Sequence, residues 1–200
     1  MCGLAGHNST KQKTFAHAAI LAQLAHRGPD AQAHWGEEGI DLYHSRLSII
    51  DTDERANQPF HDHSGRYVLV FNGEIYNFQQ LKSGLSYPWQ TQSDTEVLLA
   101  LLIQKGAEAL SLLEGMFALA FYDRQEQSLL LARDRFGKKP LYVHQGEHSL
   151  SFASEVRVLM RMHPYLNRVS TQQVSNWLFW QTIPGGTLLP DAHSIIPTKS

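Results

Sequence analysis

A run of four short apolar segments in the second half of the chain constrains the fold more than any other feature. The segments are residues 116–122, 128–132, 141–144 and 150–153. Each has the length and composition of a buried strand, and polar stretches of five to eight residues separate them. Strands joined by such short connections pair as antiparallel hairpins, since a parallel pair needs a longer crossover. A sheet built only from alternating parallel units is therefore not expected.

The rest of the chain adds further strands and several helices to this run. Strands are predicted at residues 2–7, 42–50 and 67–71, and helices at residues 14–26, 78–82, 97–105 and 155–162. Asn77 is placed as the N-cap of the helix at 78–82, and Ser93 with Glu96 fits a capping box before the helix at 97–105. The pattern predicts an α+β fold in which two sheets are covered by helices. A content of 42% hydrophobic residues is enough to build that core.

The chain changes character at His163 and Pro164. Beyond them we expect one helix at residues 171–179, then a segment rich in proline and glycine with no further core strand. The sequence therefore predicts one domain over residues 1–163 and a connecting segment over residues 164–200.

Composition narrows the partners and the cellular location. The formal net charge is −2 and no run of lysine or arginine occurs, which argues against a nucleic-acid partner. A single cysteine cannot form an internal disulfide, and the early apolar run at residues 18–25 is too short to span a bilayer. We therefore expect a cytoplasmic protein that has no membrane partner.

Cys2 is the strongest candidate for a catalytic group. It is the only cysteine, and removal of Met1 would leave its thiol and a free α-amine on one carbon. An α-amine has an ordinary pKa of about 7.7–8.0, so it is partly neutral at pH 7 and can accept the thiol proton. The alternative is that a cysteine occupies the second position by accident, because a lone cysteine is only a candidate nucleophile.

Four polar features each have an ordinary and a functional interpretation. Residues 26–30, His-Arg-Gly-Pro-Asp, fit a simple helix stop, and Arg46 fits either a solvated strand face or a buried site for an anion. Asn72, Gly73 and Glu74 fit a hairpin turn, but the helical pattern that follows favours a loop that exposes polar groups at the end of a strand. Asp94 fits a residue that only complements a helix dipole.

The eleven histidines raise the question of a metal site. Two pairs have suitable spacing, namely His61 with His63 and His144 with His148. Both lie in turn-like stretches without a matching set of carboxylates or cysteines, so no metal is expected.

Taken together in their order, the motifs resemble those of the glutaminase domain of asparagine synthetases. The stretches are Met1-Cys2-Gly3 and residues 26–30, 46–51, 72–77, 93–96, 115–118, 133–142 and 154–156. Each motif is weak alone, but the ordered combination is specific, and it extends from Cys2 to about Leu159 and more loosely to Thr187. The resemblance implies a class II glutamine amidotransferase with the N-terminal-nucleophile hydrolase fold, a four-layer αββα sandwich.

The resemblance also implies roles for individual residues. Cys2 would be the nucleophile and its α-amine the base, while the Asn72 side chain and the Gly73 N–H would stabilise the oxyanion. Arg46 would bind the α-carboxylate of L-glutamine, and Glu74 and Asp94 its α-ammonium group. The backbone of Leu47, Ser48, Ile49 and Ile50 would line the slot for the glutamine side chain. Residues 27–30 resemble the family's flexible cover over bound glutamine.

One departure from the family concerns its second domain, which binds ATP and aspartate through a Ser-Gly-Gly-x-Asp-Ser loop. This sequence has no such loop, residues 183–189 resemble the connector before that domain, and the family's Pro-Pro-Gly turn is missing near residues 197–200. Glutamine hydrolysis would need no cofactor, and ATP and Mg²⁺ would belong to a separate synthetase domain or subunit. A non-catalytic glutamine-binding or assembly module is the alternative function. The apolar side chains of Trp177, Phe179 and Trp180 favour a homodimer or a partner chain.

Overall fold

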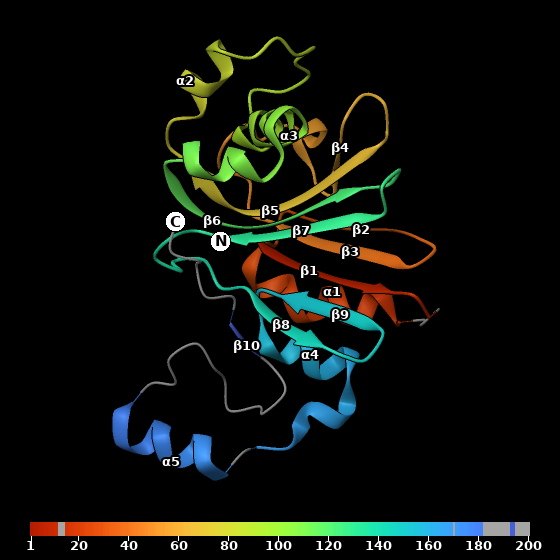
Figure 1. Ribbon diagram of the computed structural model, residues 1–200, viewed down its shortest axis with the longest axis vertical. Helices are drawn as coiled ribbons and strands as arrows, with labels where there is room; N and C mark the ends of the chain where they lie inside the picture. The colour runs from red at the N-terminus through yellow and green to blue at the C-terminus, as the bar shows by residue number, and fades with distance from the viewer. Residues whose placement is uncertain (12–14, 170, 182–192, 195–200) are drawn as a thin grey trace.

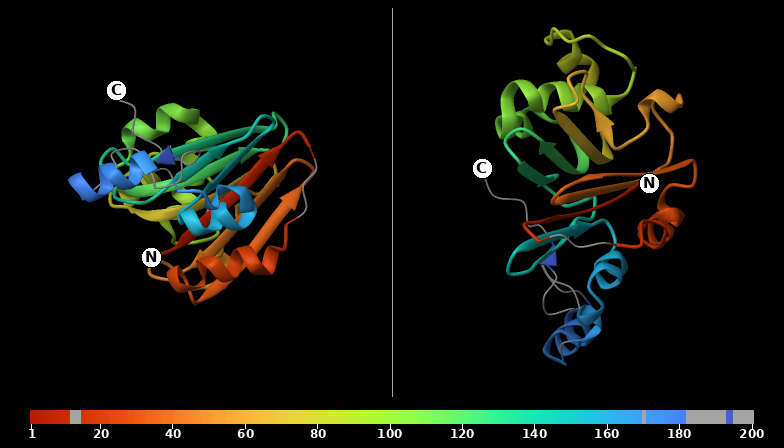
Figure 2. Two further views of the ribbon diagram at one scale, coloured as in Figure 1. Left: turned by 90° about the horizontal axis from the view of Figure 1, so that it is seen from below. Right: turned by 90° about the vertical axis from the view of Figure 1, so that its right-hand side faces the viewer.

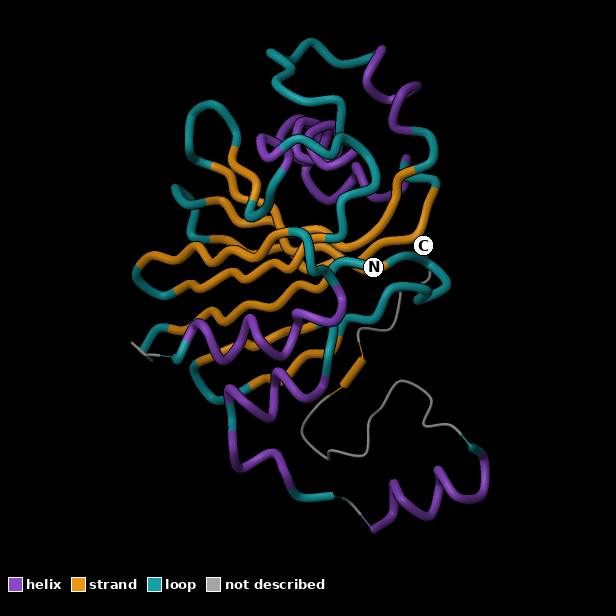
Figure 3. Tube along the Cα trace, turned by 180° about the vertical axis from the view of Figure 1, so that it is seen from behind, coloured by secondary structure: helices purple, strands orange, loops and turns teal. Residues whose placement is uncertain are grey.

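Two antiparallel sheets stack face to face, and helices cover both outer faces of the stack (Figure 1). The structure is a computed structural model that describes residues 1–11, 15–169, 171–181 and 193–194. The right-hand view in Figure 2 separates the layers, and Figure 3 shows helices on either side of the strands. The α+β class and the four-layer order predicted from the sequence are confirmed.

The larger sheet has six strands and holds the N-terminal strand in its interior. In spatial order the strands are β10 (His193–Ser194), β8 (Tyr142–Gln145), β9 (Ser149–Ala153), β1 (Gly3–Ser9), β3 (Ile40–Arg46) and β2 (Ala31–Glu37). Two helices, α1 (His17–Leu24) and α4 (Val156–Met162), pack on its outer face. Because β1 lies between β9 and β3, the start of the chain is held from both sides.

The smaller sheet has four strands. In spatial order they are β4 (Phe60–His61), β5 (Tyr67–Ile75), β6 (Gly115–Asp123) and β7 (Ser128–Arg133). Its outer face is covered by α3 (Asp94–Lys105), against which α2 (Phe78–Ser83) packs. Nine consecutive residue pairs, from Tyr67 with Asp123 to Ile75 with Gly115, join β5 to β6.

Three apolar clusters follow from the alternation of side chains along the strands. In β5, Val68 and Val70 point between the sheets, while Leu69 and Phe71 pack beneath α3. In β1, Leu4 joins the cluster between the sheets and its neighbour Ala5 joins the cluster under α1 and α4. Strands covered on both faces need apolar residues at successive positions, which is why these segments read as continuous apolar runs.

Several strand predictions were wrong. The strand predicted at residues 42–50 spans Ile40–Arg46, so residues 47–50 lie outside it. The segments at residues 128–132 and 141–144 do not form a hairpin, because β7 and β8 belong to different sheets.

The strand predicted to end at Phe71 continues to Ile75, so Asn72, Gly73 and Glu74 lie in β5 and form neither a loop nor a hairpin turn. Pairing with β6 through Ile75 maintains the extended backbone despite the glycine. The edge strand β2 was not predicted, because its sequence Ala-Gln-Ala-His-Trp-Gly-Glu lacks a clear apolar alternation.

Two helix caps also differ from expectation. Ser93 caps α3 by accepting a hydrogen bond from the Glu96 N–H at 3.3 Å, but the Glu96 carboxylate binds the N–H of Thr91 at 2.7 Å and so does not complete the capping box. The Asn77 side chain does not cap α2 and bonds instead to the segment before β6. The Asn77 amide and the Glu96 carboxylate therefore bond to the backbone of nearby loops. Rules based on local helix propensity do not predict such bonds.

Helix α5 (Thr171–Trp180), which follows α4, lies apart from the two sheets, whereas β10 further along the chain pairs with β8. The helix forms as predicted and exposes Trp177 and Phe179, whereas the two-residue strand β10 was not expected. Figure 3 shows α5 separated from the layers. The stretches at residues 183–189 and 197–200 lie outside the described residues, and the boundary at residue 163 stays a prediction. None of the described helices is both long and apolar enough to cross a membrane.

Candidate active site

A cavity of about 160 Å³ lies beside Cys2. It collects nine of the ten site residues predicted from the sequence: Cys2, Arg46, Leu47, Ile49, Ile50, Asn72, Gly73, Glu74 and Asp94. Arg46 ends β3, residues 72–74 lie in β5, and Asp94 begins α3. The remaining four, Cys2, Leu47, Ile49 and Ile50, lie just before β1 or just after β3. The tenth predicted residue, Ser48, does not line the cavity. Met1, still attached to Cys2, forms part of the wall.

The position of Cys2 is set by the register of β1 with β3. Gly3 pairs with Ser45, so the residue before Gly3 lies beside the end of β3. The Leu47 N–H donates to Cys2 Sγ at 3.4 Å, and the thiol lies 3.6 Å from the Leu47 carbonyl oxygen. Both backbone groups of Leu47 therefore fix the position of the sulfur at the edge of the cavity.

The segment at residues 27–30 supports Cys2 from outside the cavity. Arg27 donates to the Cys2 carbonyl oxygen at 3.1 Å and to Glu155 Oε1 at 2.6 Å. Asp30 accepts a hydrogen bond from the Ser48 N–H at 2.7 Å, which turns that part of the backbone away from the cavity. None of residues 27–30 lines the cavity, so in this structure they brace the site and do not cover it.

Asn72 provides an unpaired donor. The residue is 1% exposed, and its Nδ2 has no hydrogen-bond partner among the described residues. A buried donor left unpaired destabilises a fold by about 1–3 kcal/mol, so such groups are rare without a chemical reason. The side chain lines the cavity and can donate to an oxygen atom placed there.

The Gly73 N–H provides a second donor because of the strand register. The N–H groups of Phe71 and Ile75 donate to the side chains of Gln58, at 2.6 Å, and Asp94, at 3.0 Å, both on the side of β5 away from β6. N–H groups two residues apart in a strand point to the same side, so the Gly73 N–H between them also points away from β6. No side chain among the described residues accepts from it.

Only glycine fits at position 73. A Cβ atom there would lie 2.2 Å from the Met116 carbonyl oxygen and 2.8 Å from Phe117 Cα. Both contacts are with the backbone of β6, which cannot shift without breaking the sheet. The cavity wall at Gly73 is therefore bare backbone, and a ligand atom can approach the N–H closely.

Arg46 is buried and partly engaged by the protein. Its Nη1 donates to the Asp53 carbonyl oxygen at 2.9 Å and to Asn57 Oδ1 at 2.7 Å, and its Nη2 donates to the Asp51 carbonyl oxygen. These bonds occupy three of the five guanidinium donors. Two donors, Nε–H and one Nη2–H, have no partner among the described residues. The arginine thus organises the loop at residues 51–57 and retains donors for an anion.

Two carboxylates give the cavity a negative side. Asp94 is 5% exposed and accepts from the Ile75 N–H, while Glu74 lies on the neighbouring strand. Burial, and to a lesser degree the charge of Glu74, raise the pKa of Asp94 to about 6, although backbone hydrogen bonds oppose the shift. A cation bound between the two carboxylates would relieve this destabilisation.

Gln58, Thr95 and Lys139 also line the cavity, although the sequence analysis gave them no role. Gln58 donates to Thr95 Oγ1 at 3.4 Å and accepts from Phe71, so it positions the strand that carries Asn72. Lys139 is 6% exposed and belongs to the motif at residues 133–142, which is the signal that could have found it. No local pattern marks Gln58.

The histidine pairs judged unsuitable for a metal have other partners. His63 Nε2 lies 2.5 Å from the Pro88 carbonyl oxygen, and His144 Nε2 lies 2.7 Å from the Tyr165 hydroxyl. Neither pair belongs to the set of three metal-ligand side chains found among the described residues, which lies elsewhere.

Comparison with known proteins identifies the family. The family model described as "Glutamine amidotransferase domain" matches residues 1–199. The chain belongs to the glutamine amidotransferase domain family. The resemblance inferred from the ordered motifs is confirmed.

The curated relatives of this glutamine amidotransferase domain are much longer than the chain. It is 44% identical over 140 residues to asparagine synthetase B (glutamine-hydrolyzing) of Escherichia coli K12, covering 68% of this chain and 25% of that protein. It is 35% identical over 202 residues to asparagine synthetase (glutamine-hydrolyzing) 1 of Bacillus subtilis, covering 96% of this chain and 32% of that protein. The chain thus spans about a quarter to a third of the length of these relatives.

A solved structure has the same fold. The glutamine phosphoribosylpyrophosphate amidotransferase of Bacillus subtilis superposes on this glutamine amidotransferase domain with a TM-score of 0.65 and 24% sequence identity. The match covers 80% of this chain and 43% of that one. This likeness confirms the fold class that the motif resemblance implied.

Proposed function

We propose that this domain hydrolyses L-glutamine to glutamate and ammonia through a γ-glutamyl thioester on Cys2. The observation that carries the proposal is the pairing of a nucleophile with two free donors. Cys2, the unpaired Asn72 amide and the outward-facing Gly73 N–H line one cavity. Acyl transfer needs this combination, because attack on an amide places negative charge on its oxygen.

The reaction begins with the α-amine that removal of Met1 would release. The amine accepts the thiol proton, and Cys2 Sγ bonds to the amide carbon while the carbonyl electron pair moves to oxygen. Asn72 and Gly73 donate to that oxyanion. The protonated α-amine of Cys2 then gives its proton to the nitrogen of the glutamine side-chain amide. The C–N bond breaks, which releases ammonia and leaves the thioester. Water, deprotonated by the amine, attacks the thioester, and the thiolate leaves with glutamate as product.

The other end of glutamine would be held by charge. The two remaining donors of Arg46 would bind the α-carboxylate, since a guanidinium matches a carboxylate as a fork. Glu74 and Asp94 would bind the α-ammonium group. The backbone of Leu47, Ile49 and Ile50 would line the slot between these ends. Ser48, whose N–H donates to Asp30, would contribute only by fixing the loop.

The wider context follows from the relatives and stays part of the proposal. Proteins named as glutamine-hydrolysing asparagine synthetases are three to four times as long as the matched segment. We assign residues 1–163 to the glutaminase domain and 164–200 to a connector toward a synthetase domain or subunit. That partner would use ATP and Mg²⁺ to amidate aspartate or a similar carboxylate, whereas glutamine hydrolysis itself would use no cofactor.

Intact mass and glutamate release from the purified chain test the proposal. We expect loss of Met1, turnover of glutamine by the wild type, and a fall of at least about 10³-fold in Cys2→Ala with an unchanged Tm. Equal turnover in Cys2→Ala would exclude the mechanism. A retained Met1 together with no turnover would favour a non-catalytic glutamine-binding or assembly module.

A second assay separates hydrolysis from synthesis. Incubated with aspartate, glutamine, ATP and Mg²⁺, the chain should form glutamate without AMP or asparagine, since its sequence contains no Gly-rich phosphate-binding loop. Formation of AMP coupled to asparagine would show that the ligase chemistry resides in these 200 residues.

A further inference from the structure

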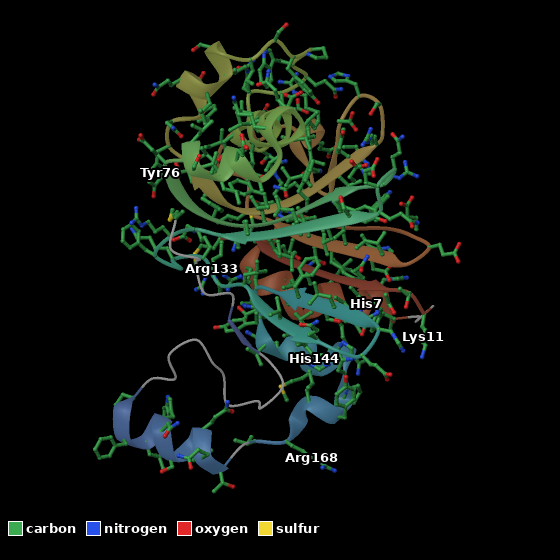
Figure 4. All side chains as sticks on the ribbon, viewed as in Figure 1. His7, Lys11, Tyr76, Arg133, His144 and Arg168 are labelled. Carbon is green, nitrogen blue, oxygen red and sulfur yellow. The ribbon has the colours of Figure 1, made fainter. Side chains whose placement is uncertain are left out.

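A second cavity, of about 570 Å³, lies at the end of the large sheet opposite Cys2. Figure 4 shows Lys11 and His7, which line it, on the opposite side of the molecule from Arg133 and Tyr76. His7 lies five residue positions after Cys2 along an extended chain, which corresponds to roughly 17 Å. The cavity is therefore independent of the glutaminase site.

Three side chains with metal-binding atoms converge at this cavity. His17 begins α1, His34 lies in β2 and Asp41 lies in β3, and one ligand atom of each lies within 4.8 Å of the others. The hairpin register explains the convergence, because His34 pairs with Tyr43 and Gly36 pairs with Asp41. Paired residues, and residues two apart, share a face of the sheet. That face is the one covered by α1.

The missing side chain of Gly36 makes room for the cluster. A Cβ atom at this position would lie 2.6 Å from Asp41 Oδ1 and 3.1 Å from His34 Nε2. Any larger residue would push the carboxylate and the imidazole apart. The glycine therefore leaves space between β2 and β3 in which polar heads can meet.

The two imidazoles are already oriented by other groups. His34 Nε2 lies 2.7 Å from Asp41 Oδ1, and His17 Nδ1 lies 2.9 Å from the Tyr43 hydroxyl. Their rings stack with centroids 3.8 Å apart and an interplanar angle of 22°. The Tyr43 contact at Nδ1 fixes the His17 ring and leaves its Nε2 to face an ion, which is the usual arrangement around a bound metal. His34 Nε2 and Asp41 Oδ1 are already in contact and would bind the ion side by side.

We propose that His17, His34 and Asp41 bind one divalent first-row transition-metal ion, for which Zn²⁺ is the natural probe. Two imidazoles and one carboxylate suit Zn²⁺ with an open fourth position, whereas Mg²⁺ and Ca²⁺ prefer oxygen ligands throughout. Tetrahedral bonds of about 2.0–2.2 Å place ligand atoms about 3.3 Å apart. The His34–Asp41 contact must therefore widen by about 0.6 Å, and the longest separation must shorten. The two stacked rings must also rotate, because a bound ion lies in the plane of each imidazole that binds it.

The charges around the cluster favour a cation. Glu37 and Glu38 line the same cavity, with Lys11 as the opposing charge. Glu37 is held by Arg124 at 2.7 Å, so the carboxylates of Asp41 and Glu38 remain to balance a divalent ion. A bound ion would tie the start of α1 to the hairpin of β2 and β3 and would stabilise the folded chain.

The test is a Zn²⁺ titration of the full chain against a competing chelator. We expect one equivalent to bind, with affinity reduced at least about 100-fold in His17→Gln, His34→Gln and Asp41→Asn and about 10–100-fold in Tyr43→Phe. His148→Gln is the matched control, because His148 lies 3.5 Å from Glu147 but belongs to no set of three ligands in the described chain. It should bind Zn²⁺ as the wild type does.

A Cys2→Ser background and X-ray absorption of the wild-type Zn²⁺ complex make the result independent of variant folding. Two imidazole nitrogens and no sulfur in the coordination shell support the site. Sulfur in that shell, or binding that is lost in Cys2→Ser but kept in His17→Gln, would assign the ion to the thiol and overturn the proposal. Equal affinity in all three ligand variants would overturn it as well.

Discussion

The two cavities lie at opposite ends of one sheet and differ in how their polar groups are paired. Beside Cys2, the Asn72 amide has no partner within the described chain, and the pKa of the buried Asp94 is raised to about 6. In the second cavity, His34 is bonded to Asp41 and His17 to Tyr43. An unpaired buried group destabilises the fold until a substrate bonds to it, whereas groups that are already paired and partly exposed need no ligand. The cavity beside Cys2 is therefore suited to reaction with a bound ligand. The second cavity is suited to a metal ion that takes the place of the proton between His34 and Asp41.

The largest effect on activity is expected for Asn72, whose amide N–H group is unpaired, in contrast to Asn77, whose side chain is hydrogen-bonded. Asn72→Ala should lower kcat/KM for glutamine about 10²–10³-fold with little change in Tm, because its Nδ2 donor has no protein partner to lose. Asn77→Ala is the matched control, since its side chain bonds to Leu112 and Glu114. It should lower Tm and leave the rate unchanged. The reverse outcome would remove Asn72 from the oxyanion site.

Arg46 should show both behaviours, because it serves the loop and the substrate. Arg46→Ala should weaken glutamine recognition by roughly 2–4 kcal/mol, on the order of 10²-fold in kcat/KM, and should also lower Tm. Arg46→Lys should rescue poorly, since lysine lacks the fork. Arg55→Ala, an exposed arginine of the same loop, should change neither quantity. A lower Tm with an unchanged KM would make Arg46 purely structural.

The ionised Asp94 carboxylate should lower the stability of the fold and strengthen glutamine binding. Its folded pKa of about 6 exceeds the ordinary 3.8, so its stabilising protonation is fully present below about pH 4 and is lost as the pH rises through 6. At pH 7.5, Asp94→Asn should therefore raise stability, by an amount on the order of 2–3 kcal/mol, while raising KM. In the wild type, glutamine binding should weaken as the pH falls below about 6. A KM independent of pH from 5 to 8 would exclude this role.

The smallest effect is expected for the same substitution in the second cavity. In metal-free protein, Asp41→Asn should lower stability by less than about 1 kcal/mol, because it removes a partly exposed pair with His34. Thermal unfolding of both aspartate variants at pH 7.5 makes the comparison. A higher Tm in Asp41→Asn would mean that this carboxylate is also destabilised, and the contrast between the cavities would fail.

Several features could be predicted from the sequence because they depend on local pattern. Continuous apolar runs such as residues 116–122 indicate strands that are covered on both faces. The ordered motifs from Cys2 to Asp94 predicted the family and the residues that line the first cavity. The edge strand β2 left no such pattern. An edge strand needs only one partner, so its sequence is weakly constrained.

Only the tertiary structure decided how these residues are presented. The alternating direction of N–H groups along β5 points the Gly73 N–H away from β6. The loop at residues 51–57 accepts hydrogen bonds from three of the five donors of Arg46, and Asp30 holds the Ser48 N–H away from the cavity. The meeting of His17 with His34 and Asp41 likewise depends on helix α1 crossing a hairpin whose register places Gly36 beside Asp41. Such contacts join residues through space, and the direction of a single hydrogen bond leaves no mark on periodicity or composition. The sequence by itself therefore determined the layers and the identity of the reacting groups, while long-range register and hydrogen bonding determined which of those groups remain free to act.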